Sequence, residues 1–218
     1  SKGVVVIETG VLLERTDIGN DERSRYHDFG QTFLRIGTGA NLEIQVATSF
    51  ASFKPTPNAD ATNGLTPLKL GGKMHLADEK GAWPEISFIG NVTLPWIGEE
   101  DFRPEYIAPD FRFIFYNSLS DRFGIGYNLG MAWDGNEARS SFVYSLMFAA
   151  NVVGDLSVFV EVFGGFPEGS SSNHSFDLGL TYLVSPVFQL DASFGSTFTD
   201  PNSYYFNFGA AYMIGSAP

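Results

Sequence analysis

The sequence predicts an all-β protein: a closed antiparallel up-and-down transmembrane β-barrel of about 12 strands. Three observations support this fold. Apolar and polar residues alternate with a period of two along most of the 218 residues, which is the side-chain period of a strand. The candidate strands have roughly 9 to 14 residues, as tilted membrane strands do. Long polar loops alternate with tight turns, which is typical of an outer-membrane barrel.

The candidate strands cover the chain without an interdomain linker, so residues 1–218 are expected to form a single barrel domain. In chain order they lie at 4–16, 26–37, 41–54, 66–77, 84–96, 106–117, 122–134, 139–152, 155–167, 174–184, 187–198 and 203–214. The longer or more polar connections are IGNDERSR, KPTPNADATNG, IGEEDFRPE, DGNEA, PEGSSSN and TDPN, and the tight turns are GTGA, DEKGA, SLSD, VGD and SP. An even number of strands returns the chain to its starting side, so both termini are expected at the short-turn, periplasmic end.

The side chains on the two strand faces predict which face is outside. In strand 122–134, large apolar residues such as Leu129 alternate with Gly124, Gly126 and Gly130, and glycine suits a confined lumen better than a solvated surface. A soluble barrel with an apolar interior is the alternative, but so many large rings would overpack one interior. The residues expected to face lipid include Phe111, Phe113, Phe115, Leu129, Phe148, Phe188 and Phe194.

Tyrosine and tryptophan residues gather near the ends of the candidate strands. Such amphipathic rings are enriched at the two membrane interfaces, so two aromatic girdles are expected. Their candidate members are Trp83, Trp96, Tyr106, Trp133, Tyr182, Tyr204 and Tyr212.

The composition excludes several classes of function. The chain has 25 acidic and 13 basic residues and a formal charge of -12, which is the wrong sign for a nucleic-acid partner. It has no cysteine, which excludes disulfides, cysteine zinc sites and thiol catalysis. Charged residues make up 17% of the chain, against about 25% in soluble domains, as expected for a large lipid-facing surface.

The polar faces of the strands carry charges of both signs, which would share one lumen. One interpretation is a selectivity lining that attracts and orients a solute. The other is a salt-bridged plug that fills and stiffens a narrow barrel. The candidate lumen-lining residues are Glu8, Arg35, Glu43, Lys69, Lys73, Asp110, Arg112, Asn128, Glu161 and Asp191.

Catalysis has little support in the sequence. His27 lies beside Asp28, His75 lies in a strand with lysines, and His174 lies in a serine-rich loop. A hydrolase at the bilayer surface is the enzymatic alternative, but a serine near a histidine is by itself no triad. His75 with Glu43 would supply only half of a metal site. No catalytic residue, metal ligand or cofactor is predicted.

A structural role is the remaining class. The loop runs Asp21 to Glu22 and Glu99 to Asp101 are acidic, and would hold divalent ions against lipopolysaccharide or a basic envelope partner. The alternative is a solvated rim, because charge is ordinary in loops. In the structural role, the barrel would be a non-conducting subunit of a larger outer-membrane assembly or a homo-oligomer.

A series of segments runs through nearly the whole chain: ETGVLLE, TFLRIGTGANLEIQV, TPLKLGGKMHL, PEISFIGNVTLP, IAPDFRFIF, GIGYNLGMAWDG, FVEVFGG and FDLGLTYLVSPVFQLDAS. In order and spacing they resemble the outer-membrane transporters grouped as the phenol meta-cleavage pathway family. The resemblance implies a barrel in the outer membrane of a Gram-negative-type bacterium, surrounded by lipid and lipopolysaccharide, that passes small solutes including hydrophobic or aromatic compounds. It implies no catalytic residue. The chain departs from the family in ending AAYMIGSAP, so either Tyr212 would serve as the C-terminal assembly signal or the end has been altered.

Overall fold

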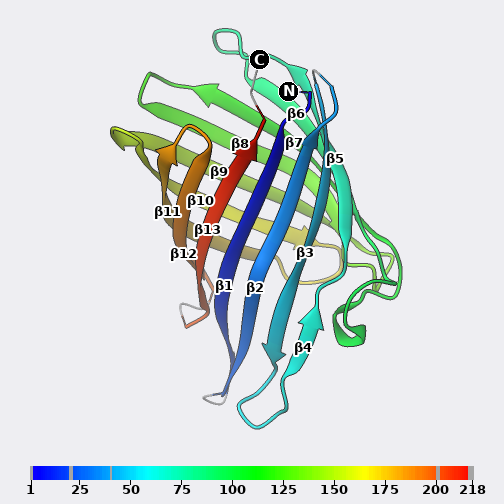
Figure 1. Ribbon diagram of the computed structural model, residues 1–218. Coiled ribbons are helices and arrows are strands. Elements are labelled where there is room, and N and C mark those ends of the chain that lie inside the picture. Colours follow the sequence, from blue (N-terminus) through cyan, green and yellow to red (C-terminus); the bar gives the residue numbers. More distant parts are fainter. Residues whose placement is uncertain (1, 20–21, 40, 200–201, 216–218) are drawn as a thin grey trace.

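The protein forms one closed antiparallel barrel (Figure 1). The computed structural model describes residues 2–19, 22–39, 41–199 and 202–215. The described chain consists of β1 (Val5–Gly19), β2 (Glu22–Gly37), β3 (Leu42–Lys54), β4 (Thr62–Leu65), β5 (Lys69–Ala77), β6 (Glu85–Thr93), η1 (Glu100–Phe102), β7 (Ala108–Ser118), β8 (Phe123–Trp133), β9 (Ser140–Val153), β10 (Leu156–Pro167), β11 (Asn173–Ser185), β12 (Phe188–Thr197) and β13 (Tyr204–Ile214). Twelve of these strands form the wall, and the four-residue strand β4 extends it at one rim.

The barrel closes where the first strand pairs with the last. β1 lies antiparallel to β13, from Val5 opposite Ile214 to Arg15 opposite Tyr204. All other neighbours in the wall are consecutive along the chain, so the predicted up-and-down order is confirmed. The start of β1 and the end of β13 lie at one end, which is the short-turn end, as predicted (Figure 1).

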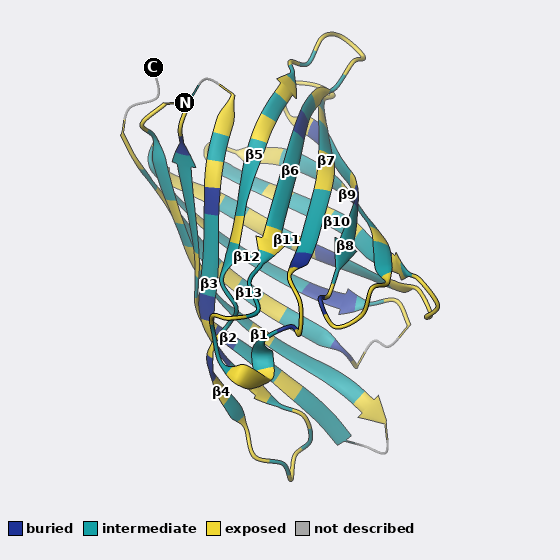
Figure 2. Cartoon of the chain, turned by 90° about the vertical axis from the view of Figure 1, so that its right-hand side faces the viewer, coloured by how far each residue is buried: buried dark blue, intermediate teal, exposed yellow. Residues whose placement is uncertain are grey.

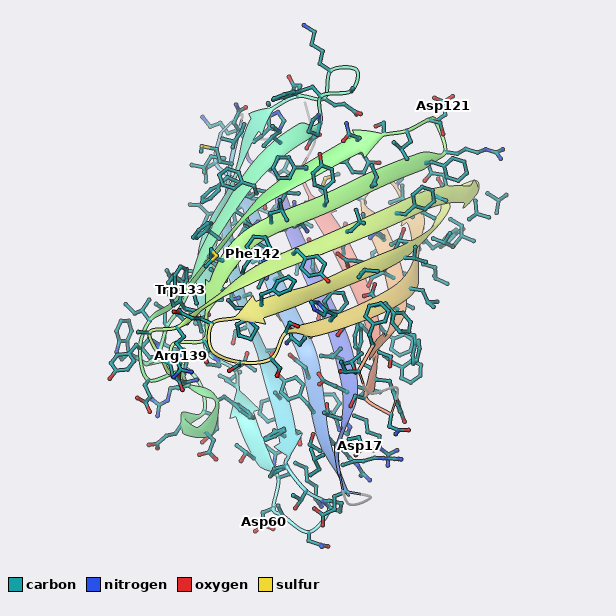
Figure 3. The ribbon with its side chains drawn as sticks, turned by 180° about the vertical axis from the view of Figure 1, so that it is seen from behind. Asp17, Asp60, Asp121, Trp133, Arg139 and Phe142 are labelled. Atoms are coloured by element: carbon teal, nitrogen blue, oxygen red, sulfur yellow. The ribbon has the colours of Figure 1, made fainter. Side chains whose placement is uncertain are left out.

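The two ends of the barrel differ as the loop lengths predict. Figure 3 shows Asp121, in the tight turn between β7 and β8, at the end opposite to Asp17 and Asp60. Asp17 lies near the tip of the β1–β2 hairpin, and Asp60 lies in the long connection before β4. Within the described ranges, no helix is long and apolar enough to cross a membrane.

The strand predicted at 66–77 is shorter in the structure, where β5 begins at Lys69. Pro67 has no N–H to donate to a neighbouring strand, so the chain leaves the regular ladder there. Thr66 bridges the break, because its N–H donates to the Ser49 carbonyl at 2.8 Å and its Oγ1 accepts from the Ser49 N–H at 2.9 Å. The segment before it pairs with β3 as β4, where the sequence analysis expected a loop.

The outer surface of the wall is apolar. Phe113 is paired with Leu129, and Phe194 with Phe206, so these side chains share one face. Phe113, Leu129 and Phe148 are 41%, 43% and 41% exposed. In Figure 2, exposed and less exposed residues alternate along the strands. A surface with this much exposed apolar area is stable in lipid rather than in water, and the seven predicted lipid-facing residues lie on it.

The inner face of the wall is polar. Among the described residues, the buried apolar side chains are those of Ala51, Pro104 and Ala108. The buried polar or charged residues are Asp28, Gln45, Ser49, Ser87, Ser145, Asp177, Ser196 and Ser203. A soluble barrel would show the opposite distribution, so the structure rejects that alternative.

Aromatic residues at both ends of the wall agree with the predicted girdles. Trp83 in the β5–β6 turn is 62% exposed, and Tyr182 and Tyr212 at the same end are 46% and 49% exposed. Trp96 and Tyr106, in the β6–β7 loop at the other end, are both 65% exposed. These positions suit rings that lie at the two membrane interfaces.

Candidate functional site

Glycines on the inner face lie directly beneath large side chains of a neighbouring strand. A Cβ added to Gly130 would come within 2.8 Å of Arg112 Cγ, and one added to Gly209 would lie 2.5 Å from Asp191 Oδ1. We call these positions the seat glycines, because the covering side chain lies flat against the wall only where Cβ is absent. The seat glycines and their covering residues are Gly71 with Asn91, Gly124 with Tyr116, Gly130 with Arg112, Gly179 with Phe159, Gly195 with Tyr205, and Gly209 with Asp191.

An ion network joins β1, β2 and β3 at the short-turn end of the lumen. The Arg35 guanidinium donates through Nε and Nη2 to the two oxygens of Glu43, at 2.8 and 3.0 Å, and through Nη1 to Glu8 Oε1 at 2.8 Å. Gln45 Nε2 donates to Glu43 Oε1 at 2.7 Å. Lys73 lies opposite Glu43 in the β3–β5 register. The two parallel hydrogen bonds from Arg35 to Glu43 make a bidentate contact, which is the strong form of an arginine–carboxylate ion pair.

A second ion pair lies on β5 and β7. Lys69 Nζ contacts Asp110 Oδ2 at 3.1 Å, and Asn91 Nδ2 donates to Asp110 Oδ1 at 3.0 Å. Both oxygens of this carboxylate therefore have donors. Side-chain exposure is 43% for Lys69 and 12% for Asp110, so the lysine remains accessible from the lumen.

Two polar cavities lie inside the barrel. The first has a volume of about 430 Å³, lies toward the short turns, and is lined by Glu8, Arg35 and Asp191 among others. The second has a volume of about 480 Å³ and lies toward the long loops. Its lining includes Arg112, Asn128, Ser141, Ser145, Glu161, Phe163, Asp177 and Tyr205. We call the second one the upper cavity, for the long-loop end of the barrel, which points downward in Figures 1 and 3. Six of the ten candidate lumen residues thus line one of the two cavities.

Several residues that line the upper cavity, Tyr205 among them, were not candidate site residues in the sequence analysis. Tyr205 Oη donates to Asp177 Oδ2 at 2.6 Å, and Asn128 Nδ2 donates to Ser145 Oγ at 2.8 Å. Strict alternation from Tyr204, an expected girdle residue, places Tyr205 on the inner face, so the pattern contained a signal for it.

Asp28 is another inner residue that alternation alone misplaces. Counted back from Arg35 in steps of two, the inner face of β2 would include His27 and exclude Asp28. The pairing register shifts between Phe29 and Thr32, where Gly30 has φ +67°, a conformation that favours glycine. This bulge turns Asp28 inward, where it is 6% exposed and accepts from Ser49 Oγ at 2.9 Å.

The histidines lie in three unrelated places. The His27 ring packs edge to face on Phe29 with centroids 5.9 Å apart. His75 Nε2 lies 2.8 Å from Asp78 Oδ1. The Glu43 carboxylate binds Arg35 instead. His174 Nδ1 is hydrogen-bonded to Tyr144 Oη at 3.0 Å. Among the described residues, no group of three or more metal-binding side chains is close enough to hold an ion.

The acidic loop run between β6 and β7 is used locally. Glu99 Oε1 accepts from the Glu100 N–H at 3.1 Å at the start of η1, and Asp101 Oδ2 accepts from Thr62 Oγ1 at 3.0 Å. The Thr62–Asp101 contact joins the β6–β7 loop to β4, in the connection between β3 and β5. Asp21, the first residue of the other acidic run, lies outside the described residues.

The comparison with family models identifies the relatives of this chain. The model described as "Putative MetA-pathway of phenol degradation" matches residues 15–214. The chain belongs to this family. No curated protein matches the sequence. The family match agrees with the resemblance described above.

Solved structures with the same fold include outer membrane channels and porins. An outer membrane channel from Pseudomonas putida F1 has a TM-score of 0.79 and 13% identity, covering 98% of this chain and 96% of that one. The KdgM porin has a TM-score of 0.61 and 8% identity, with coverage of 96% and 99%. The CymD monoaromatic hydrocarbon channel has a TM-score of 0.50 and 9% identity, with coverage of 98% and 88%. At these identities the likeness shows the shared fold.

Proposed function

We propose that this protein is an outer-membrane channel for the passive passage of small solutes, hydrophobic and aromatic ones included. The observation that carries the proposal is a closed wall, apolar outside, around a polar lumen with two cavities. The family and the channels of the same fold support it. The protein would lie in the outer membrane of a Gram-negative-type bacterium, in contact with lipid and lipopolysaccharide, and would catalyse no reaction.

The ten candidate lumen residues would set the electric field along the path. Arg35, Lys69, Lys73 and Arg112 supply the positive charges, and Glu8, Glu43, Asp110, Glu161 and Asp191 supply negative ones; Asn128 adds an amide. Charges that line a narrow pore act on each permeating solute at close range. The seat glycines support this role, because they allow two of these side chains, Arg112 and Asp191, to lie along the wall instead of across the lumen.

Ion conductance of the purified barrel in a planar bilayer tests the proposal. Discrete conductance steps are expected, together with swelling of liposomes in small aromatic solutes. A barrel that neither conducts nor swells liposomes, and that co-purifies at a fixed ratio with another envelope protein, would overturn the proposal in favour of a structural subunit. Phospholipid hydrolysis that is lost in His174→Ala would overturn it in favour of an enzyme.

A further inference from the structure

The charges of the lumen are separated around the wall. The four basic lumen residues lie on β2, β5 and β7. The described strands β8–β13 contain neither lysine nor arginine, yet they carry Glu161, Asp177 and Asp191 on β10, β11 and β12. One side of the lumen is therefore acidic without a basic residue on the same strands.

Two of these acids are direct neighbours. Glu161 is paired with Asp177 in the β10–β11 register, and both line the upper cavity. Like charges directly opposite each other on adjacent strands destabilise a sheet. Among the described residues that line the same cavity, Arg112 is the only base, and its side chain lies across Gly130 on β8. Two carboxylates thus face one guanidinium, and a negative charge remains uncompensated.

Asp177 provides a second, separate indication of a ligand. Its side chain is 8% exposed, and Oδ2 accepts from Tyr205. Oδ1 is buried and has no hydrogen-bond partner among the described residues. A buried acceptor without a donor is costly, and a ligand donor in the cavity would satisfy it once the Asp177 carboxylate turns toward the cavity.

The other walls of the cavity indicate the shape of the ligand. Phe163 and Val143 are part of the lining and offer apolar surface, and an aromatic ring also attracts a cation. The volume of about 480 Å³ lies in the usual range for a site that takes a small organic molecule. With two carboxylates and an arginine in the lining, the chemistry favours a hydrogen-bonding organic cation over a coordinated metal ion.

We infer that the upper cavity binds a small organic cation, a protonated amine with an apolar or aromatic body, between Glu161 and Asp177. The ammonium group donates to the two carboxylates, and the body of the ligand contacts Phe163 and Val143. The inference rests on the proposed function, since the cavity is part of the path that a solute would take. It adds the chemical class of the preferred solute.

Calorimetric titration of the folded barrel in detergent tests the inference with three probes of one shape. These are 2-phenylethylammonium, the neutral 2-phenylethanol and the anionic 3-phenylpropionate. The ammonium probe is expected to bind at least tenfold more tightly than either of the others. Equal binding of the alcohol, tighter binding of the anion, or no binding of the ammonium probe at millimolar concentration would overturn the inference.

Variants locate the site. Glu161→Gln and Asp177→Asn should each weaken binding of the ammonium probe tenfold or more. Asp121→Asn is the matched control, because it removes one carboxylate from a turn outside the lumen, and it should leave binding unchanged. Glu161→Gln should also raise the unfolding temperature, since it removes a like-charge pair. A lower unfolding temperature together with unchanged binding would contradict the assignment.

Conductance separates this inference from the proposed function. A barrel that conducts ions but does not bind the ammonium probe would overturn the inference alone. A barrel that binds the probe but passes neither ions nor solutes would overturn the proposed function alone.

Discussion

Tyr205 on β13 reaches Asp177 on β11 across the intervening strand β12. Its hydroxyl donates to Asp177 Oδ2 at 2.6 Å, and the register places Gly195 between the two residues. A Cβ at Gly195 would lie within 2.7 Å of the Tyr205 hydroxyl oxygen. Three strands therefore cooperate in one contact, and the glycine in the middle is what makes the contact sterically possible.

The first prediction is that Gly195→Ala destabilises the barrel by about 1–3 kcal/mol, the usual cost of overpacking. The new methyl group displaces the Tyr205 ring and breaks its bond to Asp177. The free energy of unfolding in lipid vesicles measures this. Gly90→Ala is the control, because its Cβ would meet only the Phe88 ring, at an ordinary 3.4 Å. Equal stability of the two variants would contradict the role of the seat glycine.

The second prediction concerns the outer face. Phe113→Arg should destabilise the barrel by about 2–4 kcal/mol if the position is at the bilayer midplane, because a guanidinium is then placed in hydrocarbon. Phe113→Leu keeps the side chain apolar and should cost much less. Unfolding in lipid vesicles distinguishes the two. A neutral effect of arginine would show that this face does not contact lipid.

The third prediction concerns the network at Arg35. Arg35→Met removes the donors to Glu8 and Glu43 and should destabilise the barrel by about 1–3 kcal/mol at neutral pH. The loss should shrink in acid, because protonated carboxyl groups no longer require a cation. Arg35→Lys retains the charge but not the two-pronged geometry and should restore only part of the stability. A loss that is independent of pH would argue against an electrostatic origin.

The fourth prediction concerns selectivity. Lys69→Gln combined with Lys73→Gln should shift ion selectivity toward cations, because the lumen carboxylates are then less compensated. The reversal potential in a salt gradient across a planar bilayer measures this. If the two lysines only help to plug the barrel, the double variant should instead have a lower unfolding temperature. Neither the unchanged barrel nor the double variant should then conduct ions.

The sequence predicted the strand order, the closure and the faces well, because each of these depends on alternation. The prediction at 187–198, for example, matches β12 at Phe188–Thr197 to within one residue at either end. In a membrane barrel the apolar residues face outward instead of inward, but they still recur at every second position along a strand. The long polar loops also predicted correctly which end holds the termini.

The details that the sequence did not predict depend on registers between strands. The bulge at Gly30 exchanges the faces of His27 and Asp28, and no period-two pattern reveals an inserted residue. The Glu161 and Asp177 pair becomes visible only when β10 and β11 are aligned. β1 ends at Gly19 instead of the predicted residue 16, and β2 begins at Glu22 instead of residue 26. The added residues are mostly polar, so no alternation of apolar side chains marks them as strand.

The seat glycines make the two surfaces of the wall unequal under mutation. An outer position such as Leu129 accepts other apolar residues, because lipid adapts to each shape. At a seat glycine every substitution adds at least one carbon, and that carbon pushes a specific neighbour, Tyr205 over Gly195 or Asp191 over Gly209, toward the axis of the barrel. Single mutations at these positions can therefore narrow the bore but never widen it, so relatives with a different solute size should differ at the seat glycines and their covering residues together.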